Sequence, residues 1–423
     1  MPGARQPRSG KGRVTVAIAT GAASIGAERA ERPYVLRLVA LFCAGWAVVY
    51  ADRTILYPLL TVIAREFGLT GFQTGLISGT YFTLYVAAML PAGLLAERLG
   101  LKRTLVLFSF LAAVGMAGFG VAANNYLALL AVAGLHGAGA GCYYTMAYSI
   151  TIHTVPSRNR GIASGVINGG MSLGLVVGLA LAGPLYHATG SWRVPFLILA
   201  VPTFLMAVLF QGAVREVPTV GRRTTPLWEL ACDPTLLRMN LSAFCVLYGW
   251  WVLLSWGPVF FQSERNIGLT MSGFYTLVIA VTAIPSGLFL GRLSDRIGRK
   301  RIILTMLPLM AFTLVAIPQV HSRTAMLATL MAYGLVGKLA WDPLAISWLG
   351  DYVARRRPEA VGTAVALFSF ISVLSAVVGP PLTGWLKDLT GSLAGGFYVA
   401  AGLTLVGFVL SLGPADSGPG ARP

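Results

Sequence analysis

The chain has 423 residues, of which 56% are hydrophobic and only 11% are charged, against about 25% charged in an ordinary soluble domain. A soluble fold cannot bury so much apolar surface, which indicates an integral membrane protein. The net charge of +17 does not indicate nucleic-acid binding, because the basic residues lie between apolar runs rather than on one face. The four cysteines are scattered, so we expect no disulfide framework, no metal site and no cofactor.

Residues 1–33 are rich in Gly, Ala and Arg and contain no strongly apolar core. We interpret them as a disordered, basic cytoplasmic tail rather than a signal peptide.

Twelve apolar segments follow, each long enough to cross about 30 Å of hydrocarbon. Their expected bounds are 36–63, 72–95, 103–122, 126–153, 161–186, 194–212, 239–261, 271–291, 302–319, 325–350, 360–385 and 395–413. The pattern predicts an all-α membrane protein with two six-helix bundles, at 34–212 and 239–413. A cytoplasmic linker, 213–238, joins the bundles, and a cytoplasmic tail, 414–423, ends the chain.

The distribution of Lys and Arg orients these segments, because cytoplasmic loops carry an excess of basic residues. With the N-terminus inside, the cytoplasmic segments hold 24 Lys and Arg residues and the other side holds five. We therefore predict that both termini are cytoplasmic. We expect a monomer in the plasma membrane, the inner membrane of a bacterium.

The two halves resemble each other in sequence. "GLLAERLGLKR" (93–103) matches "GRLSDRIGRKR" (291–301) at an offset of 198, and "TGS" recurs at 189–191 and 390–392 at an offset of 201. An offset that stays this constant along a half-chain indicates a tandem duplication of a six-helix unit, with the substrate site at the interface of the halves.

These features resemble the major facilitator superfamily, in which the "G-x-L-x-[DE]-R-x-G-x-K-R" loop follows spans two and eight. Three further pieces, "ADR" (51–53), "GSWRVPF" (190–196) and "GPPLTGWLKDLTGS" (379–392), are similar to the anion:cation symporters. The resemblance implies a secondary active transporter, not an enzyme. It implies alternating access and proton-coupled uptake of a small organic anion, such as a sugar acid or another carboxylate.

The repeated loop contains an acid at the end of each span, Glu97 and Asp295, next to arginines. Its glycines allow close helix packing and a tight reversal of the chain. The simple interpretation is that the basic residues only keep these loops on the cytoplasmic side. The resemblance implies in addition that the loops form a cytoplasmic gate. The residues of this expected gate are Gly93, Glu97, Arg98, Gly100, Arg103, Gly291, Asp295, Arg296, Gly298 and Arg301.

Four charges fall inside the predicted spans: Asp52 and Arg53 in span one, Lys338 and Asp342 in span ten. Each costs about 2.5–3.5 kcal/mol at mid-bilayer, so such residues normally face an interior cavity. Lys338 and Asp342 are four apart and can meet on one helix face. Asp52 and Arg53 are adjacent, so their side chains diverge by about 100°.

The resemblance implies that Arg53 binds the substrate carboxylate, for which its planar, five-donor head is suited. Lys338 would add a cation from the other half. Asp52 is the first candidate for the proton carrier and Asp342 the second. Structural salt bridges are the alternative for all four residues.

One departure from the symporters concerns span four, where they carry a glutamate that takes part in proton coupling. Here the stretch is "HGAGAGCYYTM" (136–146), with Ala140 or Cys142 at that place. By the repeat, Cys142 lies opposite Asp342, so either the acid has moved to span ten or the protein is a uniporter or exchanger.

The resemblance implies that spans one, four, seven and ten line the cavity. Several rings on these spans are candidates for orienting a substrate. They are Tyr50, Tyr57, His136, Tyr144, Trp250 and Trp341, although His136 could equally be a packing residue. The main alternative function is a proton-driven exporter of drugs or metabolites, which only a partial motif in span five supports. A membrane enzyme would need a nucleophile or paired carboxylates, and a receptor would need a further domain; neither feature is evident.

Overall fold

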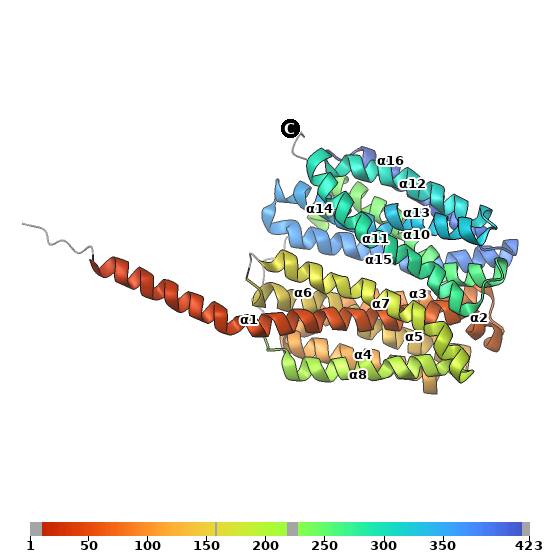
Figure 1. Cartoon of the computed structure of the whole chain (residues 1–423), viewed down its shortest axis with the longest axis horizontal. Coiled ribbons are helices and arrows are strands. Elements are labelled where there is room, and N and C mark those ends of the chain that lie inside the picture. Colours follow the sequence, from red (N-terminus) through yellow and green to blue (C-terminus); the bar gives the residue numbers. More distant parts are fainter. Residues whose placement is uncertain (1–10, 157–158, 218–226, 417–423) are drawn as a thin grey trace, which may run out of the picture.

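The computed structural model describes residues 11–156, 159–217 and 227–416, and this part of the chain is a bundle of helices (Figure 1). Twelve of its helical segments are long and apolar enough to cross a membrane, which confirms the number of spans predicted from the sequence. The helices are α1 (Lys11–Thr54), α2 (Leu56–Phe67), α3 (Gly71–Leu99), α4 (Leu101–Val121), α5 (Tyr126–Gly141), α6 (Tyr143–Thr154), α7 (Arg160–Thr189), α8 (Arg193–Ala213), α9 (Leu227–Ala231), α10 (Pro234–Glu264), α11 (Leu269–Ile297), α12 (Arg299–Gln319), α13 (Arg323–Val336), α14 (Lys338–Ala354), α15 (Val361–Thr390) and α16 (Ala394–Leu412). In Figure 1 the first half, red to yellow-green, lies below the second half, green to blue.

The N-terminal segment differs from its prediction. The structure begins α1 at Lys11, so the backbone of 11–33 is helical where the sequence predicts a disordered tail. Ala, Arg and Glu, which have high helix propensity, are frequent in this segment. The prediction of disorder rested on overall composition and did not consider helix propensity. Residues 1–10, 218–226 of the linker and 417–423 of the C-terminal tail lie outside the described residues.

Three spans that the sequence predicts as continuous are interrupted near their middle. The chain breaks its helix at Ile55 between α1 and α2, at Cys142 between α5 and α6, and at Gly337 between α13 and α14. Gly337 is extended, with φ −76° and ψ −173°. Glycine-rich sequence precedes Cys142, and Pro58 follows Ile55 by three residues, so each break coincides with residues that weaken a helix. Two of the breaks lie beside the four membrane charges.

Equivalent hydrogen bonds recur in the two halves. Glu66 accepts from the Trp192 indole at 2.6 Å and pairs with Arg193 at 2.8 Å. Glu264, 198 residues after Glu66, accepts from the Ser392 hydroxyl at 2.8 Å. Each acid therefore ties the end of the first span of its half to the start of the last, as a tandem duplication would produce.

The halves touch at the face of the bundle opposite the loops at 97–103 and 295–301. There the Asp388 carboxylate of α15 accepts from the backbone N–H groups of Gly71 and Phe72 at 2.6 and 2.8 Å, at the start of α3. Gly75, one turn further on, packs directly against the backbone of Pro380. We call the face of the bundle that holds these contacts the opposite face.

At the other end, which we call the terminal face, the same helices have no such packing. A Cβ atom built at Gly93 of α3, Gly161 of α7, Gly291 of α11 or Gly362 of α15 would meet no atom within 4 Å. The close contacts between the halves described above therefore lie at the opposite face, and these four glycines of the terminal face take no part in such packing.

Candidate functional site

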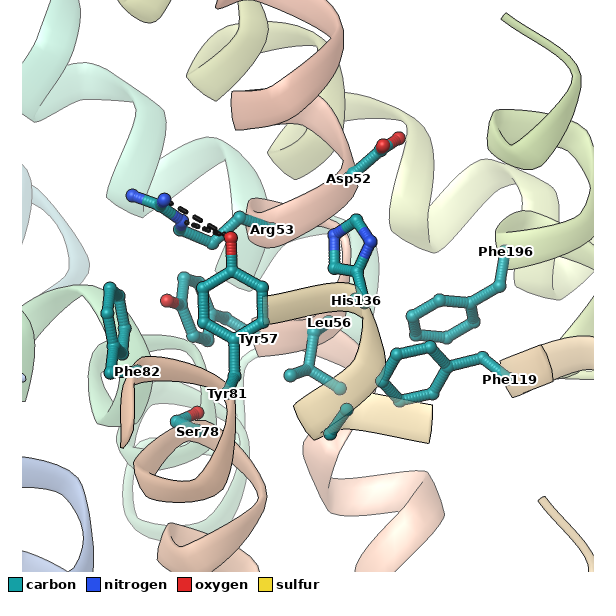
Figure 2. Close-up of a pocket in the computed structure, with 11 residues that line it drawn as sticks. Asp52, Arg53, Leu56, Tyr57, Ser78, Tyr81, Phe82, Phe119, His136 and Phe196 are labelled. Atoms are coloured by element: carbon teal, nitrogen blue, oxygen red, sulfur yellow. Dashed lines mark hydrogen bonds between the residues drawn. The ribbon is translucent and has the colours of Figure 1, made fainter. Parts of the chain in front are cut away.

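Arg53 lies in the last turn of α1 and is buried among aromatic side chains. Its Nε and Nη2 both donate to the Tyr81 hydroxyl at 3.2 Å (Figure 2). Five rings surround its guanidinium carbon at centroid distances of 4.7 to 5.7 Å: Tyr50, Tyr81, Phe82, Tyr85 and Trp251. We call these five residues the aromatic shell. Their faces stabilise the cation through cation–π contacts.

Within the described part of the chain, no carboxylate forms an ion pair with Arg53, although the side chain is only 5% exposed. A buried charge without a counter-ion is costly, and in membrane proteins such a charge marks a binding site. The planar guanidinium matches a carboxylate, which can accept two parallel hydrogen bonds from it. The site around Arg53 is therefore suited to an anion.

Asp52 points away from Arg53, as the predicted divergence of adjacent residues requires (Figure 2). Its Oδ2 lies 2.7 Å from the Thr203 hydroxyl of α8. Its Oδ1 is buried and has no hydrogen-bond partner among the described residues. The two adjacent charges are therefore held by different helices and do not neutralise each other.

A small cavity of about 10 Å³ lies beside Asp52 and Arg53. His136 and Ser78 also line it, and each contributes a buried polar atom, His136 Nε2 and Ser78 Oγ, without a partner in the described structure. The volume and the three polar atoms suit about one water molecule.

His136 and Tyr57, both predicted substrate residues, lie on this cavity. His136 Nδ1 is 3.0 Å from the Ala112 carbonyl, and its ring centroid is 5.4 Å from that of Tyr81. In Figure 2, His136 lies beside Tyr81 on the side of Asp52, away from the Arg53 guanidinium.

Lys338 and Asp342 form the predicted pair on one face of α14, with Nζ and Oδ2 3.0 Å apart. The Lys338 side chain is 8% exposed and that of Asp342 26%. Lys338 is the first residue after the break at Gly337, and it lies within electrostatic range of Tyr50 and Arg53. The cations of the two halves therefore act on the same region.

The remaining ring residues predicted to bind substrate are not among the five rings around Arg53. Tyr144 is half-buried within electrostatic range of Asp342, and Trp341 stacks on Phe368 with centroids 6.4 Å apart. Trp250 is buried, but its neighbour Trp251 is the residue whose ring lies over Arg53.

Sequence reasoning missed the rings of α3. Tyr81 and Tyr85 are four residues apart and so share one helix face, and both lie against Arg53. The family resemblance directed attention to spans one, four, seven and ten, and α3 forms span two. Thr203, the partner of Asp52, was also missed because a lone threonine in span six carries no signal.

The repeated loops make the tight reversals that their glycines predict. Gly100 and Gly298 have φ values of +94° and +102°, a conformation that other residues rarely adopt. Each glycine ends one helix and begins the next, which produces the expected tight reversal.

The acid of the second loop pairs with an arginine outside the expected gate. Asp295, near the end of α11, lies 3.5 Å from Arg299, the first residue of α12, because the reversal at Gly298 brings the two helix ends together. Arg299 also pairs with Asp351 of α14. Glu97, Arg98 and Arg103 are exposed, and none of them forms an ion pair within the described part of the chain.

Comparisons with known proteins agree with this architecture. The family model described as "Major Facilitator Superfamily" matches residues 42–337 and 239–423. The chain is 24% identical to the hexuronate transporter of Bacillus subtilis (strain 168), over 86% of this chain and 90% of that protein. It is 25% identical to the "Probable sulfoacetate transporter SauU" of Cupriavidus necator, over 89% of this chain and 92% of that protein.

A solved structure shares the fold. It is a bacterial homologue of the human lysosomal transporter Spinster in an inward-facing, occupied conformation, which superposes with a TM-score of 0.73 at 18% identity and covers 90% of this chain and 96% of that one. With twelve membrane-crossing helices, duplicated loops and a family model that matches most of its length, the chain belongs to the Major Facilitator Superfamily of membrane transporters.

Proposed function

We propose that the protein is a secondary active transporter that takes up a small organic anion together with protons by alternating access. The observation that carries this proposal is Arg53, a buried cation that no carboxylate of the described chain neutralises. The relatives named as hexuronate and sulfoacetate transporters support an anionic substrate.

In the proposed binding step, the carboxylate of the substrate replaces the Tyr81 hydroxyl on one edge of the Arg53 guanidinium. Lys338 provides a second cationic contact from the other half. It is held 3.0 Å from Asp342, so the anion competes with that carboxylate for the ammonium group. Binding would in this way couple the two halves.

Asp52 is the proposed proton carrier, on the basis of its hydrogen-bond geometry. The Thr203 hydroxyl lies 2.7 Å from both Asp52 Oδ2 and the Leu199 carbonyl, and it has one proton to donate. A protonated Asp52 would donate to Thr203, which could then donate to Leu199, and all three groups would be satisfied. An ionised Asp52 would leave one acceptor without a proton. Asp342 would be the second carrier.

The contacts between the halves at the opposite face support alternating access, because they hold that side of the bundle together. If the terminal face is cytoplasmic, as the distribution of basic residues predicts, the side held together faces away from the cytoplasm. Opening the other way would break the contacts of Asp388 with the start of α3, and the loops at 97–103 and 295–301 would form the cytoplasmic gate.

The test is uptake of labelled glucuronate and sulfoacetate into proteoliposomes with an imposed pH gradient. We expect uptake that depends on the gradient, is lost in Arg53→Ala and is partly retained in Arg53→Lys, which keeps the charge but not the two-pronged donor geometry. Arg65→Ala is the matched control, since Arg65 is an exposed arginine of the same span. Full uptake by Arg53→Ala would refute the anion site, and uptake indifferent to the gradient would favour a uniporter or exchanger.

A further inference from the structure

The surroundings of Arg53 are made of rings from both halves of the protein. Tyr81, Phe82 and Tyr85 come from α3, and Trp251 comes from α10 of the other half. The rings of Phe82 and Trp251 lie 4.4 Å apart, so they join the halves at the proposed anion site. A substrate bound at Arg53 would meet aromatic faces on several sides.

The rings continue from the aromatic shell toward the second cation. Trp46 lies 5.3 Å from Tyr50 and 6.2 Å from Tyr144. Tyr144 is within electrostatic range of both Lys338 and Asp342. A series of ring contacts therefore runs from the aromatic shell to Tyr144, which interacts electrostatically with the charged pair of α14.

Three indole N–H groups in or beside this series of rings have no acceptor. The Nε1 atoms of Trp46, Trp251 and Trp341, the last of them three residues after Lys338, are buried without a partner in the described structure, and the three residues are 2–3% exposed. An indole N–H can only donate. These groups suit the oxygens of an anion and cannot accept from the hydroxyl groups of a sugar.

The amide side chains that could bind the hydroxyl groups of a sugar lie away from Arg53. Asn and Gln both donate and accept, as the hydroxyl groups of a sugar require. Gln73 caps α3, Gln262 bonds to Pro58 and Ser272 at the opposite face, and Gln319 bonds to Tyr398. The buried Asn240, whose Oδ1 has no partner in the described structure, lies eleven residues before Trp251 on α10, about three helical turns away. The observed contacts of Arg53 and Lys338 within the described chain include neither Asn nor Gln.

We infer that the substrate is a monocarboxylate that carries an aromatic ring, in contrast to the sugar acids of the relatives. This inference rests on the anion transport proposed above. Arg53 binds the carboxylate, and the ring packs against Trp251 and Phe82 of the aromatic shell. One carboxylate suffices, because Asp342 already neutralises Lys338 and leaves Arg53 as the uncompensated cation of the pair.

Calorimetric titration of the purified, full-length protein tests this with 4-hydroxybenzoate and glucuronate at one pH. We expect 4-hydroxybenzoate to bind at least about ten-fold more tightly. Trp251→Leu should lower that preference by about three- to ten-fold, since a ring–ring contact is lost. Trp348→Leu is the control, because Trp348 is also buried but bonds to the Ala415 carbonyl at the terminal face, and it should leave the preference unchanged.

Phe82→Leu removes a smaller ring from the same shell and serves if Trp251→Leu does not fold. Equal or tighter binding of glucuronate would overturn the inference and leave the proposed anion transport intact. A preference that survives in both shell variants would also overturn it. If neither acid nor sulfoacetate binds to protein that melts cooperatively, the proposed function fails as well.

Discussion

The two halves of the protein hold their membrane charges in different ways. Lys338 and Asp342 are four residues apart on α14, and their charged atoms meet at 3.0 Å. Asp52 and Arg53 are adjacent on α1, and they turn to different helices, Asp52 to Thr203 and Arg53 to the aromatic shell (Figure 2).

Sequence spacing alone produces this difference. Residues four apart share a helix face, and adjacent residues do not. The pair in the second half is therefore neutral as a unit, whereas the contacts of Arg53 among the described residues are aromatic faces and a hydroxyl. An anion finds an uncompensated partner in the first half and a competitor, Asp342, in the second.

The strongest test of this contrast replaces Arg53 with an apolar residue of similar length. Arg53→Met should weaken anion binding by at least about 30-fold, since truncating one partner of a buried charge pair costs about 2–5 kcal/mol. Stability in detergent should be unchanged or higher, because no counter-ion is left behind. Anion titration and thermal unfolding of the same variant provide both values. A large loss of stability would show that Arg53 is a structural residue.

Asp342→Ala, unlike Arg53→Met, should lower the stability of the protein. It leaves the Lys338 ammonium buried without a partner, at a cost of about 2–3 kcal/mol; this is below the range for fully buried pairs because Asp342 is partly exposed. Lys338→Met should cost less, since Asp342 can still reach water.

The control is a second ion pair, which has the same spacing in the sequence but lies at the surface. Asp295 and Arg299 are also four apart, but the Asp295 side chain is 67% exposed. Asp295→Ala should therefore change the free energy of unfolding by less than about 1 kcal/mol. Equal losses in Asp342→Ala and Asp295→Ala would refute the contrast between a buried and an exposed pair.

Much of the fold was predictable because hydropathy and charge report directly on the bilayer. The twelve spans follow from apolar length, and the reversals at Gly100 and Gly298 follow from glycine at a tight turn. The pairing of Lys338 with Asp342 follows from their spacing. Each of these features depends on residues close together in the chain.

The rest of the site depends on contacts between distant segments. Tyr81 is 28 residues from Arg53, and Thr203 is 151 residues from Asp52. Both contacts depend on where α3 and α8 lie relative to α1, which hydropathy does not encode. The choice of Trp251 over Trp250 likewise depends on the rotation of α10, because adjacent residues face different neighbours.

A change beside Asp52 should have a smaller effect than the changes at Arg53 and Asp342. Thr203→Val keeps the shape of the side chain and removes the hydroxyl that lies 2.7 Å from the carboxyl group. Because Asp52 Oδ1 already has no partner, the free energy of unfolding should fall by about 1–3 kcal/mol. Thr151→Val, whose hydroxyl donates only to the Ala147 carbonyl, should cost less. Equal costs would show that Thr203 does not support Asp52.

The smallest expected effect concerns the hydroxyl that holds Arg53 in the unliganded state. Tyr81 accepts from Nε and Nη2, and a carboxylate needs that same edge of the guanidinium for two parallel hydrogen bonds. Tyr81→Phe should therefore tighten anion binding by about three- to ten-fold and lower the free energy of unfolding by about 0.5–1.5 kcal/mol, both from the loss of one interaction.

Tyr333→Phe is the chemical control for that change, because the Tyr333 hydroxyl is buried without a partner in the described structure. Its removal should leave anion binding unchanged and should not lower stability, since no hydrogen bond is lost. If Tyr81→Phe instead binds the anion more weakly, the Tyr81 hydroxyl contacts the bound anion rather than competing with it. In that case Arg53 and Tyr81 would form a single anion site, and the aromatic shell would contribute a hydrogen bond to the substrate as well as its ring faces.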